Sequence, residues 1–189
     1  MKYFLTAIGG FFLIVLIFVF SLIGFYNSLI TQRTEVQTQR AQTETQLQRR
    51  FDLIPSLVGA VKGAMKQEQK VFDAIAKART QYAGAPSGSN EKLQAAGQYE
   101  SAISRLLVVM ENYPQLKSID TVQNLMTQLE GTENRISVAR QRYNESVQTY
   151  NNSVQYFPGS IIANIFGFSK EVMFKGVQGS EKAPVVNLE

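Results

Sequence analysis

The chain has 189 residues and is mildly basic, with 19 lysines and arginines against 15 aspartates and glutamates. It contains no cysteine and no histidine, so it forms no disulfide and lacks the commonest metal ligand and the usual general base. This composition excludes a zinc site of the Cys/His type and a Ser-His-Asp triad. Because lysines and arginines are interleaved with glutamates and glutamines rather than clustered, we expect no nucleic-acid partner.

An apolar stretch runs from Tyr3 to Phe25 without one charged side chain. As a helix rising about 1.5 Å per residue it reaches roughly 34 Å, enough to cross a hydrocarbon core of about 30 Å. The stretch is longer than the apolar core of a signal peptide and has no A-x-A-like cleavage sequence, so we expect residues 1–26 to form a retained, single-pass anchor. Tyr3, Phe25 and Tyr26 are predicted to lie at the lipid headgroups, whereas the flanking charges do not decide the orientation.

The pattern after the anchor is helical. From Asn27 to Ile54 apolar residues are sparse, and beyond Pro55 they become frequent. Pro55 either kinks one long helix or lies in the first turn of a new one. A loop is expected at residues 84–90, with Asn90 as the N-cap of a third helix that runs to about Tyr113.

The last long helix is predicted to begin at Asp120 and to reach Tyr156 or Phe157. A strict seven-residue period indicates coiled-coil-like packing with a left-handed crossing near +20°. The residues of this seam are Val122, Leu129, Ile136, Tyr143, Tyr150 and Phe157.

These elements predict an all-α protein: an N-terminal transmembrane helix followed by an elongated antiparallel up-and-down bundle over residues 27–168. The tail, residues 169–189, is expected to be extended or partly disordered. Two topologies remain open. Either the chain turns first at the 84–90 loop and returns with Phe157 near the bilayer, or it folds back at Pro55 or Pro114. The first topology brings a short apolar segment close to lipid, although packing on the bundle also accounts for its residues, which are Ile161, Ile162, Ile165, Phe166 and Phe168.

Two sets of polar residues on different predicted helices are complementary in charge. They are Arg49, Arg50 and Asp52 on one helix and Glu133, Arg135, Arg140 and Asn144 on the other. We expect an inter-helix network that fixes the packing register, with a binding site as the alternative. Glu130 and Glu133 share a helix face, which gives a formal acid-base pair without a partner base or metal.

Two tyrosines on the last long helix, Tyr143 and Tyr150, are expected to pack in the bundle with their hydroxyls reaching water. The alternative is an inter-helix groove around Tyr99, Tyr143 and Tyr150 that receives a peptide or a lipid tail. No catalytic residue, cofactor or metal ligand is indicated.

Several motifs recur together along the chain. Residues 49–58 read RRFDLIPSLV, residues 77–79 read KAR, and residues 132–144 read TENRISVARQRYN, followed by Tyr150-Asn151, Phe157-Pro158 and Gly167-Phe168. This combination resembles the LemA family over nearly the whole chain. The resemblance implies a bacterial cytoplasmic-membrane protein with its helical domain outside the cytoplasm, and it carries no catalytic residues across.

The sequence therefore favours a non-enzymatic, membrane-anchored scaffold of the cell envelope. We expect it to form a homo-oligomer or to present a surface to other envelope proteins. The alternatives are a peptide- or lipid-binding module on a membrane tether and, third, a membrane-bound hydrolase that uses Glu130 or Glu133.

Overall fold

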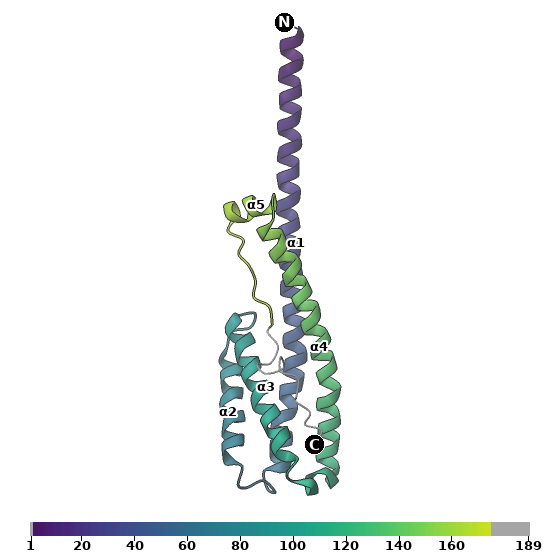
Figure 1. The fold of residues 1–189 in the computed structure, drawn as a ribbon, viewed down its shortest axis with the longest axis vertical. Helices are drawn as coiled ribbons and strands as arrows, with labels where there is room; N and C mark the ends of the chain where they lie inside the picture. The colour runs from purple at the N-terminus through teal and green to yellow at the C-terminus, as the bar shows by residue number, and fades with distance from the viewer. Residues whose placement is uncertain (1, 175–189) are drawn as a thin grey trace, which may run out of the picture. The chain divides into compact units, whose positions relative to one another are not determined.

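The computed structural model describes residues 2–174, and the regular secondary structure of this part of the chain is entirely helical, without a strand (Figure 1). Its elements are α1 (Lys2–Val61), α2 (Gln69–Gly84), α3 (Asn90–Met110), the short 3-10 helix η1 (Pro114–Ser118), α4 (Asp120–Gln155) and α5 (Gly159–Phe166). The predicted all-α class is confirmed, and the helix packing is that of a bundle. The predicted tail lies outside the described residues from position 175 onward, and residues 169–174 are neither helix nor strand.

The described residues divide into two compact units. Residues 39–143 with Phe174 form what we call the bundle unit. Residues 2–38 with 144–173 form the terminal unit. Both α1 and α4 contribute residues to each unit, because neither helix is interrupted at the division. Whether residue 26 separates two domains stays a prediction.

In the bundle unit, α1 and α4 run antiparallel. The Thr43 hydroxyl donates to the Ala139 carbonyl oxygen at 3.2 Å, and further along α1 Arg50 pairs with Glu133, which lies earlier on α4. Between them α2 and α3 form a helical hairpin, so the four helical segments alternate in direction (Figure 1).

The chain makes its first turn at residues 62–68, which neither predicted topology contains. Pro55 lies inside α1, so the alternative of one long helix is confirmed and the fold-back at Pro55 is wrong. The prediction of a first turn at the 84–90 loop is also wrong. Helical periodicity does not show where one helix ends and the chain reverses direction. In this chain the helix ends at Val61, and the turn that follows contains Gly63, a residue of low helix propensity.

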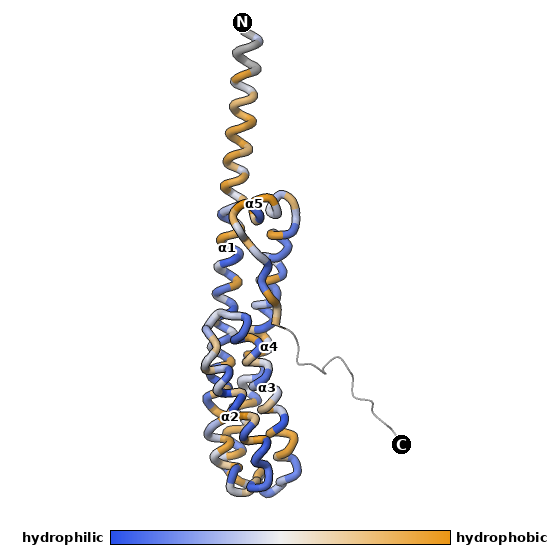
Figure 2. The backbone as a smooth tube through the Cα atoms, turned by 90° about the vertical axis from the view of Figure 1, so that its left-hand side faces the viewer, coloured by the Kyte–Doolittle hydropathy of each residue, from blue (hydrophilic) through white to orange (hydrophobic). Residues whose placement is uncertain are grey.

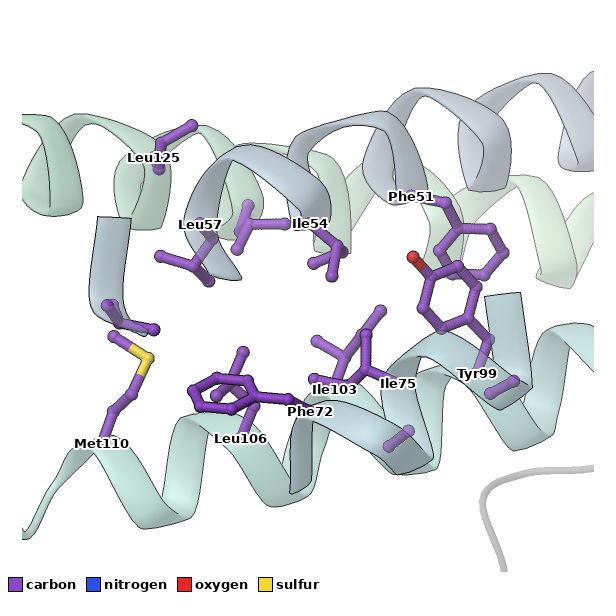
Figure 3. Close-up of a cluster of buried hydrophobic side chains, with 14 of the residues drawn as sticks. Phe51, Ile54, Leu57, Phe72, Ile75, Tyr99, Ile103, Leu106, Met110 and Leu125 are labelled. Atoms are coloured by element: carbon purple, nitrogen blue, oxygen red, sulfur yellow. The ribbon is translucent and has the colours of Figure 1, made fainter. Parts of the chain in front are cut away.

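The core of the bundle unit lies between α1, α2, α3 and α4 (Figure 3). The Phe51 ring contacts the rings of Tyr82 and Tyr99, with centroids 4.7 and 4.3 Å apart, which ties α1 to both helices of the hairpin. Beyond these rings the core is mainly aliphatic. Its labelled members in Figure 3 include Ile54, Leu57, Phe72, Ile75, Ile103, Leu106, Met110 and Leu125.

The seven-residue seam of α4 is confirmed from Val122 to Tyr150, because each of these residues is buried. Phe157 is the exception and is 81% exposed. The helix ends at Gln155, so Phe157 belongs to the following turn and no longer follows the helical period.

Two predicted helix ends are wrong by small amounts. The N-cap of α3 is Ser89, whose hydroxyl oxygen accepts from the Lys92 N–H at 3.0 Å, and Asn90 is the first helical residue. Both residue types are good N-caps, so composition does not distinguish them. The helix ends at Met110 rather than near Tyr113, because Pro114 begins η1.

The terminal unit joins the first part of α1 to the end of α4 and to α5. Its buried apolar residues are Leu29, Val36, Val147, Tyr150, Val154, Ile162, Ala163 and Phe168. After α4 the chain turns sharply at Gly159, where a Cβ atom would collide with the Ser153 carbonyl oxygen. The helix α5 then ends at Phe166 and is capped by Gly167, whose φ of +72° suits glycine.

Candidate functional site

A buried ionic cluster joins three helices of the bundle unit. Glu100 on α3 is 5% exposed, and its Oε2 accepts from Arg140 Nη2 on α4 at 2.5 Å. Arg50 Nη1 on α1 lies 3.9 Å from Glu100 Oε1 and also pairs with Glu133. Two arginines therefore share one buried carboxylate, and each member of the cluster offsets part of the cost of burying another.

The structure brings together three of the seven predicted network residues, namely Arg50, Glu133 and Arg140. Their common partner is Glu100, which the sequence analysis did not include. It was missed because the prediction paired α1 with α4 and left out the helix between them. The signal available was its spacing: Glu100 follows Ala96 by four residues and precedes Ile103 by three, and both are buried.

The other predicted network residues lie elsewhere. The Asp52 carboxylate accepts from Gln48 on its own helix at 2.7 Å, and Arg49 and Asp52 line an open surface cavity of about 750 Å³. Arg135 lines another surface cavity, of about 410 Å³. Asn144 belongs to the terminal unit.

A second buried contact fixes the loop between α2 and α3 to α1. Arg40 donates from Nη1 to the Gly88 carbonyl and from Nη2 to the Tyr143 hydroxyl, the latter at 2.8 Å. The Gly88 N–H donates to Glu44 Oε1 at 2.9 Å, so α1 holds both polar groups of this residue. Gly88 has φ of +74°, a conformation that glycine adopts readily.

Lys92 makes a similar contact at the start of α3. Its Nζ donates to the Tyr82 carbonyl oxygen at 2.7 Å and lies 3.9 Å from the centroid of the Tyr82 ring. The pKa of the Tyr82 phenol is raised to about 12, first by burial and then by the charges of Glu44 and Asp52. The phenol therefore stays neutral at ordinary pH.

The three tyrosines of the predicted groove have different surroundings. In the bundle unit, the Tyr99 ring packs on the rings of Phe51 and Tyr82. Also in this unit, the Arg40 guanidinium lies over the Tyr143 ring, which contacts the ring of Phe174. Tyr150 belongs to the terminal unit, and burial raises its pKa. Within residues 2–174 the hydroxyls of Tyr99 and Tyr150 have no hydrogen-bond partner. All three side chains are buried, so the expectation that the hydroxyls of Tyr143 and Tyr150 reach water is wrong. Whether these residues admit a ligand stays a prediction.

In the terminal unit, α1 presents a bare apolar surface. Among the described residues one helix is apolar and long enough to cross a membrane, and the apolar window near its N-terminus is wholly exposed (Figure 2). Of the predicted interface anchors, Tyr3 is exposed, Phe25 is partly exposed and Tyr26 packs against α5. The Tyr26 ring lies 4.7 Å from that of Phe166 and 5.9 Å from that of Phe168, measured between centroids.

The carboxylates that the hydrolase alternative requires lie in different settings. Glu133 is ion-paired with Arg50, whereas Glu130 lines an apolar cavity of about 390 Å³ with Leu107, Met110 and Met126. In the described residues, no three side chains among His, Cys, Asp and Glu are grouped to hold a metal ion.

Comparison with known proteins finds similarity to magnetosome proteins. The chain is 29% identical over 186 residues to "Magnetosome protein MamQ 2" of Paramagnetospirillum magneticum, covering 85% of this chain and 68% of that protein. It is 28% identical over 182 residues to "Magnetosome protein MamQ" of Magnetospirillum gryphiswaldense, covering 83% and 67%.

The family comparison includes most of the residues described above. The model of the LemA family matches residues 39–188, a range that contains Arg50, Glu100, Glu133 and Arg140. With the motifs at residues 49–58 and 132–144, this match shows that the chain belongs to the LemA family.

Proposed function

We propose that this protein is a non-enzymatic, single-pass scaffold of the bacterial cell envelope, anchored by the N-terminal part of α1. Its bundle unit self-associates or presents a surface to other envelope proteins. The observation that carries the proposal is the wholly exposed apolar window of α1. Water would face a continuous apolar surface there, and such a surface favours lipid or protein as its neighbour.

The buried charges of the bundle unit support a structural role. The side chains of Arg50, Glu100 and Arg140 are turned toward one another across three helices. Such a cluster favours one register of the helices over alternatives, because a slipped register would bury a charge without its partner. A bundle with a fixed register is suited to presenting a constant surface.

The relatives add modest support. Their names mention a cellular structure, the magnetosome, and no reaction. We infer from this a structural role for the present chain, and we do not infer that the chain belongs to a magnetosome.

The anchor is tested by placing charges in the apolar window. We expect Leu13→Asp combined with Ile17→Asp to release the full chain from membranes in an alkaline wash, because each charge costs about 2.5–3.5 kcal/mol at a helix centre. The matched control is Val138→Asp, an exposed position on α4, which should stay with the membrane fraction. Release of the unsubstituted chain by the same wash would contradict the anchor.

Self-association is tested by the mass of the full chain in lipid nanodiscs and in mild detergent. A defined assembly supports the homo-oligomer. A monomer at every concentration contradicts self-association and leaves presentation of a surface to other proteins. A co-purifying peptide or lipid that stays bound would instead favour the alternative of a binding module on a membrane tether.

A further inference from the structure

The helix α5 has one face buried and one face exposed. Ile162 and Ala163 are buried in the terminal unit, whereas Ile161, Ile165 and Phe166 are 49%, 70% and 59% exposed. Tyr156 and Phe157, in the turn that leads into α5, are also exposed. The buried face already accounts for packing within the unit, so packing does not explain the exposed one.

The segment that contains α5 carries no charge. From Ser146 to Ser169 the sequence has no Asp, Glu, Lys or Arg, and the same holds on α1 from Tyr3 to Gln32. The charges next to these stretches are Lys2 and Arg33 on α1, and Glu145 and Lys170 on the segment that contains α5. Both apolar segments therefore lie within uncharged stretches of the terminal unit.

The contacts of Tyr26 give the position of α5 along α1. Its ring meets Phe166 and Phe168 directly after the end of the apolar stretch at Phe25. Figure 2 shows α5 beside α1 where the hydrophobic part of that helix ends. Phe25 and Pro158 also line one small cavity, of about 230 Å³, which confirms that the turn before α5 lies at this level.

The chain holds α5 in this place from both sides. Before the helix, Gly159 allows the backbone to approach the Ser153 carbonyl. After it, the Asn151 side chain accepts from the Glu171 N–H at 2.8 Å and donates to the Glu171 carbonyl at 2.9 Å. The exposed face of α5 is thus presented by a fixed backbone.

We propose that α5 and the preceding turn form a second membrane contact, in which Phe157, Ile161, Ile165 and Phe166 lie in the headgroup region of the bilayer that α1 crosses. This inference rests on the proposed anchor. A helix with one apolar face lies in the plane of the interface with that face buried by roughly 5–10 Å. Since the segment is uncharged, its insertion requires no anionic lipid.

The absence of tryptophan from the chain gives a direct test. A single tryptophan introduced by Ile165→Trp reports on α5 in the full-length protein, reconstituted in phosphatidylcholine nanodiscs with or without brominated acyl chains. A second reporter, Phe157→Trp, covers the case in which Ile165→Trp does not fold. Phe18→Trp reports on the anchor, and Val138→Trp serves as the exposed control on α4.

We expect the α5 reporters and Phe18→Trp to be quenched by brominated lipid, and Val138→Trp to be unaffected. Quenching of Phe18→Trp without quenching of either α5 reporter would overturn the second contact while the anchor stands. Loss of quenching at all three membrane reporters would overturn the anchor and the inference with it. A blue-shifted α5 reporter that brominated lipid does not quench, and that shifts back on dilution, would assign this face to a second copy of the chain and overturn the lipid contact.

Discussion

The two units of this protein differ in where their charged residues lie. The bundle unit buries Arg50 and Glu100 among its helices and pairs Glu100 with both Arg50 and the half-buried Arg140. The terminal unit excludes charge from two long stretches and leaves apolar side chains such as Ile165 exposed. Paired charges specify which helices meet, whereas an uncharged exposed surface is compatible with a lipid environment.

Because of this difference, the stability of the two units has different physical origins. In the bundle unit, removing one partner should leave another charge buried and uncompensated, and the cost should appear in the free energy of unfolding. In the terminal unit, the corresponding energy depends on the surroundings, because apolar groups that are exposed in water are buried in a bilayer.

The largest effect is expected from Glu100→Ala. This change leaves Arg140 without its carboxylate partner and removes one of the two partners of Arg50, so the free energy of unfolding should fall by roughly 3–5 kcal/mol. Urea unfolding of the nanodisc-bound protein, followed by circular dichroism, measures it. The matched control is Glu111→Ala, an exposed carboxylate just after α3, for which we expect a change within about 0.5 kcal/mol. Equal effects of the two changes would show that the buried cluster contributes nothing specific.

High pH should destabilise the bundle unit through Tyr82. The pKa of this phenol is raised from 10.0 to about 12 in the folded protein, so the neutral form is favoured by folding. Its contribution is complete below pH 10 and is lost as the pH rises through 12, a loss of about 2–3 kcal/mol. Tyr82→Phe should flatten the fall of stability over this range, measured by urea unfolding at successive pH values. Burial also raises the pKa of Tyr99, so part of the fall should remain, and an unchanged profile would contradict the assignment to Tyr82.

The fold was accessible from the sequence where apolar residues repeat at seven-residue intervals. On α4 this pattern identified Leu129, Ile136 and Tyr143 as buried, but it also included Phe157, which lies beyond the end of the helix and is exposed. On α1 the same period continues through polar residues: positions 36, 43 and 50 are Val, Thr and Arg, and all are buried. A search restricted to apolar residues therefore found only part of that seam.

The candidate site was less accessible for a related reason. Arg40 and Arg50 look like surface residues by type, and only the buried positions seven residues before or after them on α1 indicate that they face inward. Their partners, Gly88 and Glu100, lie on a loop and a helix whose arrangement depends on the turn at residues 62–68. No local pattern indicated that turn, so the contacts that follow from it were not predictable.

A comparison between the units is possible at two tyrosines seven residues apart on α4. Tyr143 in the bundle unit accepts from Arg40, so Tyr143→Phe should cost about 1.5–3 kcal/mol, the range for hydrogen bonds to charged groups. Tyr150 in the terminal unit has a buried hydroxyl without a partner among residues 2–174, so Tyr150→Phe should be neutral or slightly stabilising. The two unfolding free energies in nanodiscs make the test. A clear loss at Tyr150→Phe would show that its hydroxyl binds a group absent from the described chain, as the groove hypothesis requires.

The smallest effect concerns one helix end in the bundle unit, where two adjacent residues are both plausible N-caps. Ser89 accepts from the Lys92 N–H, and the pKa of the Glu91 carboxyl is lowered first by its hydrogen bond with the Glu91 backbone N–H and then by one with the Ser89 side chain. Ser89→Ala should therefore reduce the free energy of unfolding by about 1 kcal/mol. Asn90 is the first residue inside α3, where alanine is at least as favourable, so Asn90→Ala should leave the stability unchanged or slightly higher. The reverse order of the two effects would move the start of α3 by one residue, and the contact between Arg40 and Gly88 would then rest on a differently built loop.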